Sequence, residues 1–235
     1  MSNLEIKISI VIPIYNESKN IKILFDEIKN SIKNNIEYEI IFVNDNSNDD
    51  SYIYLNQLKS HKKLKIINNK YRSGQSRSIY NGIINSTYET IVTLDGDCQN
   101  DPGDINNLVL TFFENVNLKL IAGIRGKRKD SALKIISSKI ANYVRNLFLN
   151  DNCPDTGCSL KVFDKKIFLN FQFFDGIHRF LPALFVGFDH QVKYIKVNHR
   201  NRKFGKSNYG TIKRLIDGIK HIFLVKKMIS KKNNV

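Results

Sequence analysis

The sequence predicts an α/β fold built on a largely parallel, doubly wound sheet, and three observations lead to this prediction. Over the first 125 residues, apolar β-branched stretches alternate with stretches whose apolar residues recur every three to four positions. Short polar clusters follow the strand-like stretches, as they do where parallel strands end at a ligand-binding edge. The chain has 235 residues, of which 42% are hydrophobic and 25% charged, enough for one ordinary core and too apolar for global disorder.

The N-terminal half shows the most regular alternation. Residues 5–13 are apolar and β-rich, and residues 18–32 carry apolar side chains at positions 21, 24, 25, 28 and 32, which is a helical stripe. Pro102 is suited to the first turn of a later helix. The other elements expected in this half are strands at 38–43, 64–67, 90–94 and 119–123 and helices at 50–58, 75–85 and 102–115.

The C-terminal half is less regular. We expect a helix with a basic face at 132–149, strands at 159–163 and 191–197, and a short apolar helix at 178–187. Residues 212–229 carry apolar side chains at 212, 215, 216, 219, 222 and 223, with basic residues mainly on the other side. We therefore divide the chain into a domain of residues 1–210 and a basic, amphipathic, membrane-proximal helix and tail of residues 211–235.

The charge of the chain is uneven. The net charge is +15, but residues 1–117 carry −3 and residues 193–235 carry +12. A basic end of this kind favours phosphates, either of nucleic acid or of a membrane surface. No apolar run approaches the ~18–20 residues of a membrane span. The start of the sequence has no signal-peptide pattern, and the three cysteines have no disulfide or zinc spacing, so we expect a reducing, cytoplasmic location.

The motif with the clearest chemistry is Asp95-Gly96-Asp97, directly after the buried stretch 90–94. Two carboxylates two residues apart at a strand end can turn toward one ligand, and Gln99 adds a neutral oxygen. Such oxygen ligands suit Mg²⁺ or Mn²⁺, which also bind phosphate oxygens. The sequence therefore predicts a metal–diphosphate site at this turn, whereas the adjacent Cys98 is expected to be a packing residue.

Polar residues after the first two strands extend the same edge. Tyr15 could pack on a nucleobase, Glu17 could accept hydrogen bonds from a base or ribose, and Asp45 could accept from a uracil or guanine edge. No Gly-x-Gly-x-x-Gly follows the first strand, which argues against a dinucleotide-dependent dehydrogenase.

Five segments occur in the order of a known family: PIYNE, VNDNSND, LDGDCQNDPGD, DGIHRFLPAL and HRNRKFGKSNYG. Over residues 6–210 the chain resembles a family 2 glycosyltransferase with the GT-A fold, a Rossmann-like, mostly parallel central sheet flanked by helices. The subgroup it most resembles is the polyprenyl-phosphate glycosyltransferases, relatives of dolichol-phosphate mannose synthase.

The resemblance implies roles for individual residues. Asp95, Asp97, Arg125 and Arg202 are the expected catalytic residues, and the expected metal ligands are Asp97 and Gln99. Arg202, with Lys206, is expected to close over the donor diphosphate. Arg125, Lys134 and Ser138 are expected at the acceptor phosphate. The nucleotide-sugar set comprises Pro13, Tyr15, Glu17, Val43, Asp45, Asp95, Gly96, Asp97, Arg202 and Lys206.

The chain departs from the family at several of these positions. Asn44 stands where an aspartate is usual, Asn208 where a lysine is usual, and Lys134 where an arginine is usual. A lysine at the acceptor site keeps the charge but loses the bidentate fork of arginine.

The reaction implied is metal-dependent transfer of a sugar, with inversion, from a UDP- or GDP-linked donor to a polyprenyl phosphate at the inner face of the membrane. We expect peripheral attachment to the membrane surface, with a membrane-embedded partner protein as an alternative anchor. The other acceptor considered is a hydroxyl in polysaccharide, glycolipid or cell-envelope synthesis. That acceptor would need a base, for which Asp155 is the first candidate.

Two other functional classes fit the sequence less well. A haloacid-dehalogenase-type phosphatase also places Asp-x-Asp after a strand, but it needs a later acidic pair, and residues 105–235 contain no adjacent acidic residues. A nucleic-acid-binding module would use the basic end alone and would bind in a salt-sensitive way. We expect no nucleic-acid partner.

Overall fold

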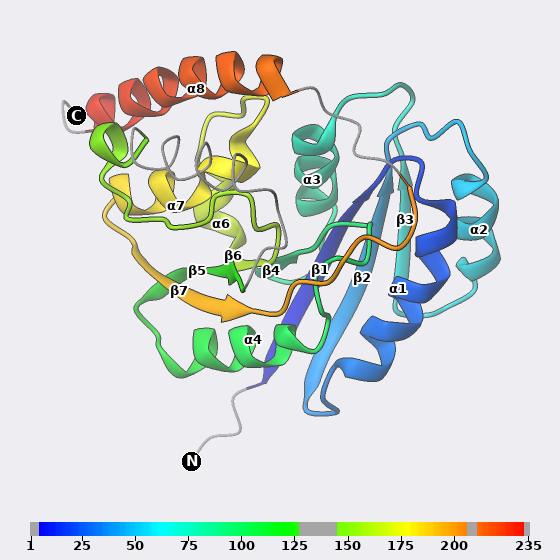
Figure 1. Ribbon diagram of the computed structural model, residues 1–235. Helices are drawn as coiled ribbons and strands as arrows, with labels where there is room; N and C mark the ends of the chain where they lie inside the picture. Colours follow the sequence, from blue (N-terminus) through cyan, green and yellow to red (C-terminus); the bar gives the residue numbers. More distant parts are fainter. Residues whose placement is uncertain (1–4, 127–144, 206–210, 233–235) are drawn as a thin grey trace.

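The computed structural model describes residues 5–126, 145–205 and the helix at 211–232, without the side chains of 211–216. In these parts seven strands form one sheet of order β3-β2-β1-β4-β6-β5-β7 (Figure 1). The strands are β1 (Ile6–Ile14), β2 (Ile36–Asn44), β3 (Leu64–Asn68), β4 (Thr90–Thr93), β5 (Leu118–Arg125), β6 (Lys161–Asp164) and β7 (Gln191–Val197). The helices are α1 (Ser18–Ser31), α2 (Ser51–Leu58), α3 (Gln75–Ile84), α4 (Asp104–Glu114), α6 (Lys165–Leu169), α7 (Ile177–Gly187) and α8 (Thr211–Lys232).

The sheet is mostly parallel, as predicted. The pairs β1–β2, β1–β4, β2–β3 and β5–β7 are parallel. The exception is β6, which is antiparallel to both β4 and β5. A parallel neighbour requires a crossover back to the starting edge. The chain instead enters β6 at the carboxyl end of β4, where Lys161 pairs with Thr93 and the Thr93 hydroxyl donates a hydrogen bond to the Ser159 carbonyl.

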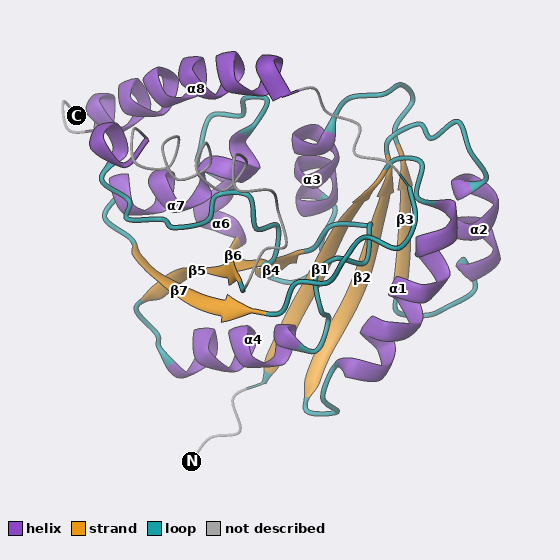
Figure 2. Ribbon diagram, viewed as in Figure 1, coloured by secondary structure: helices purple, strands orange, loops and turns teal. Residues whose placement is uncertain are grey.

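Helices cover both faces of the sheet (Figure 2). Alternate residues of β1 face opposite ways, so Ile8, Ile10 and Ile12 enter one core cluster and Val11 enters the other. The first cluster includes buried side chains of α1, α2 and α4, and the second includes those of α3, α6, α7 and α8. The apolar stripe predicted for α1 is the face it buries, including Leu24 and Ile28.

Some elements differ from expectation. The short helix α6 was not predicted, because its five residues give almost no periodicity; Asp164 caps it by accepting a 3.1 Å hydrogen bond from the Ile167 amide. The helix expected at 132–149 lies largely outside the described residues, and its last part, 145–149, is helical. None of the helices in the described parts of the chain combines the length and apolar character needed to cross a membrane.

Candidate active site

The candidate site lies where β1, β2 and β4 end side by side. The Asp45 amide donates to the Ile14 carbonyl at 2.8 Å, and the Leu94 amide donates to the Val11 carbonyl at 3.2 Å. These backbone bonds continue the parallel ladder past the strand ends. As a result, the polar residues after all three strands lie at one edge of the sheet, as the sequence predicts.

Gly96 allows the acidic turn to lie directly on β1. A Cβ atom on Gly96 would be 2.6 Å from Ile14 Cδ1 and 3.0 Å from the Pro13 carbonyl oxygen. A larger residue would therefore push the turn away from the strand. The turn closes through a 3.1 Å hydrogen bond from the Gln99 amide to Asp97 Oδ1. Cys98 is 6% exposed, and burial raises the pKa of its thiol to about 12, which fits the packing role expected for it.

Asp95 lies in an environment that disfavours its charged form. Burial, and then the neighbouring negative charge of Asp97, raises the pKa of Asp95 to about 6. Gln75, the first residue of α3, donates a 2.8 Å hydrogen bond to Asp95 Oδ1. The sequence analysis did not include Gln75 in the site, although its position at a helix start beyond the third strand was a signal for it. The turn therefore has negative charge that its surroundings compensate only in part.

The acidic turn has the oxygen donors that Mg²⁺ or Mn²⁺ prefers. The partly compensated charge on Asp95 and Asp97 fits a divalent cation, and the side chain of Gln99 adds an amide oxygen. Among the described residues, no group of three or more His, Cys, Asp or Glu side chains is arranged to hold a metal. Mg²⁺ sites shared with substrate phosphates use one or two protein carboxylates, so the Asp95–Gln99 turn would supply part of such a coordination shell.

The raised pKa of Asp95 leads to a prediction for stability without divalent ions. A carboxyl whose pKa is raised on folding contributes stability below its unfolded pKa of 3.8, and that contribution is lost as pH rises through about 6. We expect Asp95→Asn to gain stability relative to the parent protein by about 2 kcal/mol between pH 4.5 and 7.5. Urea unfolding at both pH values measures this gain. A pH-independent difference would contradict the assignment of the shift to Asp95.

A segment after β7, residues 198–205, lies against the acidic turn although it is a hundred residues away in sequence. The Arg200 amide donates to the Gln99 carbonyl at 2.7 Å, and Asn100 forms an antiparallel bridge with His199. The Arg200 guanidinium bonds Glu27 at 2.8 Å and Asp101 at 2.9 Å. Arg200 therefore fixes the path of this segment, a role that the sequence analysis missed because both partners are distant.

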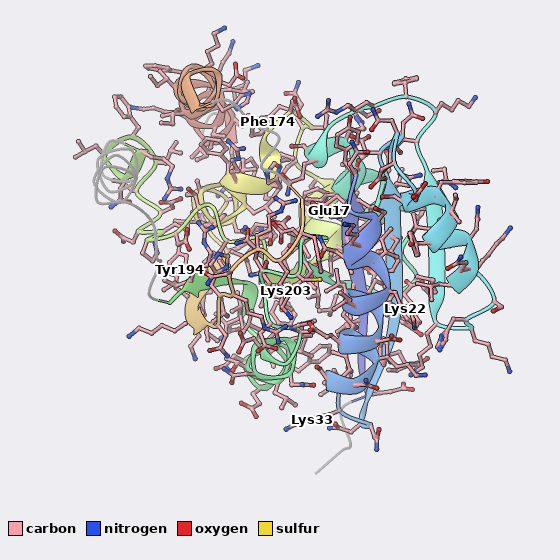
Figure 3. The ribbon with its side chains drawn as sticks, turned by 45° about the vertical axis from the view of Figure 1, so that its right-hand side comes forward. Glu17, Lys22, Lys33, Phe174, Tyr194 and Lys203 are labelled. Carbon is pink, nitrogen blue, oxygen red and sulfur yellow. The ribbon has the colours of Figure 1, made fainter. Side chains whose placement is uncertain are left out.

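The same segment places Arg202 in the site. Its guanidinium forms an ion pair with Glu17, and Nη1 lies 3.6 Å from Asp97 Oδ2. Figure 3 shows Glu17 at the start of α1 and Lys203 on the segment that crosses beside it. Glu17 also accepts a 2.6 Å hydrogen bond from Asn20, while burial raises the pKa of Glu17 despite the nearby arginine. The structure thus joins three of the expected site residues, Glu17, Asp97 and Arg202.

The residues expected to contact the nucleotide hold the neighbouring loops in place. Asp45 accepts 2.8 Å hydrogen bonds from Asn69 and from the Ser73 and Gly74 amides, so it anchors the loop between β3 and α3. The ring of Tyr15 stacks against the Arg72 guanidinium at 4.0 Å from the ring centroid. Pro13 is half-buried, and Val43 is fully buried in the core below Asp45. A pocket of about 560 Å³ beside this loop is lined by Asn69, Lys70, Tyr71, Ser73, Arg77 and Asn81.

Arg125 lies at the end of β5 and is held by a buried carboxylate. Its Nε and Nη2 atoms bond the two oxygens of Asp155 at 2.8 and 2.7 Å, and its amide donates to Asp155 at 3.1 Å. Gly157 makes room for this fork, because a Cβ there would be 2.5 Å from Arg125 Nη2. The other residues expected around the two phosphates, Lys134, Ser138 and Lys206, lie outside the described residues.

Comparison with known proteins agrees with this geometry. The family model for Glycosyl transferase family 2 matches residues 9–171. This chain belongs to glycosyl transferase family 2. Dodecaprenyl-phosphate galacturonate synthase of Rhizobium johnstonii is 30% identical over 94% of the chain. Undecaprenyl-phosphate 4-deoxy-4-formamido-L-arabinose transferase of Yersinia enterocolitica is 32% identical over 88% of the chain. The matches span 68% and 64% of these two relatives' lengths.

Solved structures show the same architecture. Glucosyl-3-phosphoglycerate synthase from Mycobacterium tuberculosis, in complex with Mn²⁺, UDP and glucosyl-3-phosphoglycerate, superposes with a TM-score of 0.67 at 14% identity. The match covers 95% of this family 2 chain and 79% of that one. A structure of that enzyme with Mg²⁺ and UDP gives a TM-score of 0.70. The fold of this glycosyltransferase is therefore GT-A, as predicted.

Proposed function

We propose that this protein transfers a sugar, with inversion, from a UDP- or GDP-linked donor to a polyprenyl phosphate. The observation that carries the proposal is the meeting of the Asp95–Asp97 turn with Arg202 at the carboxyl edge of the sheet. At this edge, carboxylate oxygens that suit a divalent ion lie beside a cationic side chain. That combination suits a diphosphate leaving group, and the relatives named as polyprenyl-phosphate sugar transferases support the acceptor class.

The donor side of the proposed reaction uses Arg202. Negative charge grows on the bridging oxygen as the nucleoside diphosphate leaves the anomeric carbon, and a preorganised guanidinium stabilises this charge. A divalent ion bound at Asp97 and Gln99 would supply Lewis-acid stabilisation of the same charge. Glu17 orients Arg202, while Tyr15 and Asp45 hold the loops that would receive the nucleotide. Lys206 is proposed as a further phosphate contact.

The acceptor side favours a phosphate over a hydroxyl. A phosphate monoester is already ionised near neutral pH, since its second pKa is about 6, and therefore needs no base. A hydroxyl acceptor would need one, yet both oxygens of Asp155 are engaged by Arg125, and the Asp155 side chain is 5% exposed. We therefore assign Arg125 to the acceptor phosphate, with Lys134 and Ser138, and Asp155 to holding Arg125.

The experiment that tests the proposal is a transfer assay with UDP- and GDP-linked sugars and undecaprenyl phosphate in vesicles, with and without Mg²⁺ or Mn²⁺. The expected product is a polyprenyl monophosphate sugar of inverted anomeric configuration, formed only with a divalent ion. Transfer to a hydroxyl acceptor with no use of the lipid phosphate would overturn the acceptor assignment. A thermal-shift panel of the same donors identifies the nucleotide, because a ligand that binds only the folded state raises the melting temperature.

Arg125→Lys tests the acceptor assignment. Lysine keeps the charge but loses the fork that contacts Asp155, so we expect the KM for the lipid phosphate to rise about 10- to 100-fold while the KM for the donor stays unchanged. Steady-state kinetics with each substrate varied in turn gives both constants. Lys196→Ala, an exposed cation on the adjacent β7, is the matched control and is expected to change neither. An equal rise in both KM values would remove Arg125 from the acceptor site.

A lipid acceptor requires the protein to reach a membrane. We propose peripheral attachment at the inner face, in which the basic residues 211–235 form a membrane-proximal unit and a membrane-embedded partner protein is a second possible anchor. The charge of the C-terminal 43 residues supports this, since basic side chains near an anionic surface contribute about 1 kcal/mol each.

A further inference from the structure

Helix α8 packs one of its faces against the protein. Ile222 and Val225 are buried in the second core cluster, and the Ile229 side chain fills the space above Gly187. The ring of His221 contacts those of Phe174, which Figure 3 shows beneath α8, and Phe180. Much of the apolar surface that the sequence assigned to a membrane is therefore used inside the fold.

A second stripe of α8 stays exposed and joins residues from elsewhere in the chain. Ile219 and Phe223 are 48% and 57% exposed, and the Phe223 ring lies 5.7 Å from the ring of Phe148. Phe148 is 38% exposed, and its neighbour Leu147 is 62% exposed. We call these four side chains the apolar patch. A contiguous exposed apolar cluster of this kind marks an interaction surface more often than scattered single residues do.

Exposed cations accompany the apolar patch on α8. The Lys226 ammonium lies 5.3 Å from the centroid of the Phe148 ring. Lys220, Lys227 and Lys231 are also exposed on the described part of α8. Asp217 is the one acidic residue in the sequence of α8. The surface therefore combines aromatic and aliphatic side chains with positive charge. We call Lys220, Lys226, Lys227 and Lys231 the lysine rim.

This combination selects one occupant. A bilayer containing anionic lipids offers both an apolar interior for the rings and negative headgroups for the lysines. A second copy of the chain would instead bring the same lysine rim against itself, and like charges across an interface are costly. A nucleic acid would satisfy the lysines but leave the aliphatic side chains Leu147 and Ile219 without apolar partners.

We propose that the apolar patch, built from Leu147, Phe148, Ile219 and Phe223, inserts into the headgroup–acyl boundary of an anionic bilayer while the lysine rim binds lipid headgroups. The proposal rests on the proposed function, because a polyprenyl phosphate is presented at a membrane. Figure 1 shows α8 at the end of the molecule toward which the arrowheads of β1 and β2 point. Docking through the patch would thus turn the carboxyl edge of the sheet toward the lipid.

The test is co-sedimentation of the purified chain with vesicles of phosphatidylcholine and phosphatidylglycerol in about a 2:1 ratio. We expect the double substitution Phe148→Ser and Phe223→Ser to lower the vesicle partition coefficient at least about tenfold. The matched control, Ile84→Ser with Val116→Ser, removes two apolar side chains that are 48% and 82% exposed at the end of α3 and in the turn before β5, and is expected to bind as the parent does. Pure phosphatidylcholine vesicles are expected to bind the parent weakly.

Several outcomes would overturn the proposal. Binding by the double variant equal to that of the parent would overturn it, and so would an equal loss in the control. It would also fail if the parent dimerised in sedimentation equilibrium and the double variant did not, because the patch would then bind a second copy. If the double variant melts early, Leu147→Ser with Ile219→Ser takes its place under the same criteria.

Transfer assays separate this proposal from the proposed function. With a short-chain, water-soluble prenyl phosphate, the double variant is expected to match the parent, whereas transfer to vesicle-borne undecaprenyl phosphate is expected to fall at least about tenfold. Loss of transfer to both acceptors in the double variant would contradict a docking role. A parent protein that binds vesicles but transfers sugar to neither acceptor would refute the proposed function and leave the docking surface in place.

Discussion

Replacement of Asp97 by alanine is expected to lower the rate of sugar transfer at least about a thousandfold without unfolding the protein. The Asp97 side chain is 14% exposed, lies 3.6 Å from Arg202, and accepts one backbone hydrogen bond inside the turn. Its loss removes the carboxylate expected to bind the divalent ion. It also removes a negative charge beside Arg202. Because Asp97 contributes little apolar packing, we expect the circular dichroism spectrum and melting temperature to stay close to those of the parent.

Initial rates with saturating donor and lipid phosphate, with and without Mn²⁺, measure this effect. Asp26→Ala is the matched control, since Asp26 is a carboxylate in a surface pair with Lys22 at the far side of α1, and its rate is expected to change less than about twofold. Asp97→Asn separates charge from shape. Should Asp97→Ala keep more than about a tenth of the parent's rate and the same metal dependence, the metal assignment would be wrong.

Asp151→Ala is expected to lower the free energy of unfolding by about 3–5 kcal/mol. The side chains of Arg145 and Asp151 are 5% and 0% exposed and form an ion pair, and Arg145 Nη2 also donates to the Cys153 carbonyl at 2.8 Å. Burial raises the pKa of Asp151, while the arginine opposes this shift. Removing the carboxylate leaves a buried guanidinium without its counter-charge, which is the costly way to break such a pair.

Urea unfolding monitored by circular dichroism measures the change in the free energy of unfolding. The control is Asp26→Ala, which removes a 47% exposed helical side chain paired with Lys22 and is expected to change stability by less than about 1 kcal/mol. Tyr194 on β7 donates its hydroxyl to the Asp151 carbonyl, so this buried cluster also ties residues 145–153 to the sheet. A loss no larger than that of the control would mean that the ion pair does not stabilise the fold.

Features that depend on residues close together in the chain could be predicted from the amino-acid pattern. The apolar spacing at positions 21, 24, 25 and 28 identified the buried face of α1, because helical periodicity depends on local order alone. The alternation of strands and helices predicted a mostly parallel sheet. It also placed Tyr15, Asp45 and Asp95 at one edge, because the carboxyl ends of adjacent parallel strands coincide.

Which side chains those residues contact depends on how distant parts of the chain pack together. The contacts of Glu17 with Arg202, and of Arg125 with Asp155, join partners 185 and 30 residues apart, and no local pattern encodes such a pairing. The same holds for Arg200 between Glu27 and Asp101, and for the antiparallel pairing of β6 with β4. Helix α8 shows most clearly where prediction from the sequence ends. Its periodicity revealed an amphipathic helix, but which of its apolar residues are buried and which stay exposed depends on the shape of the surface against which it packs.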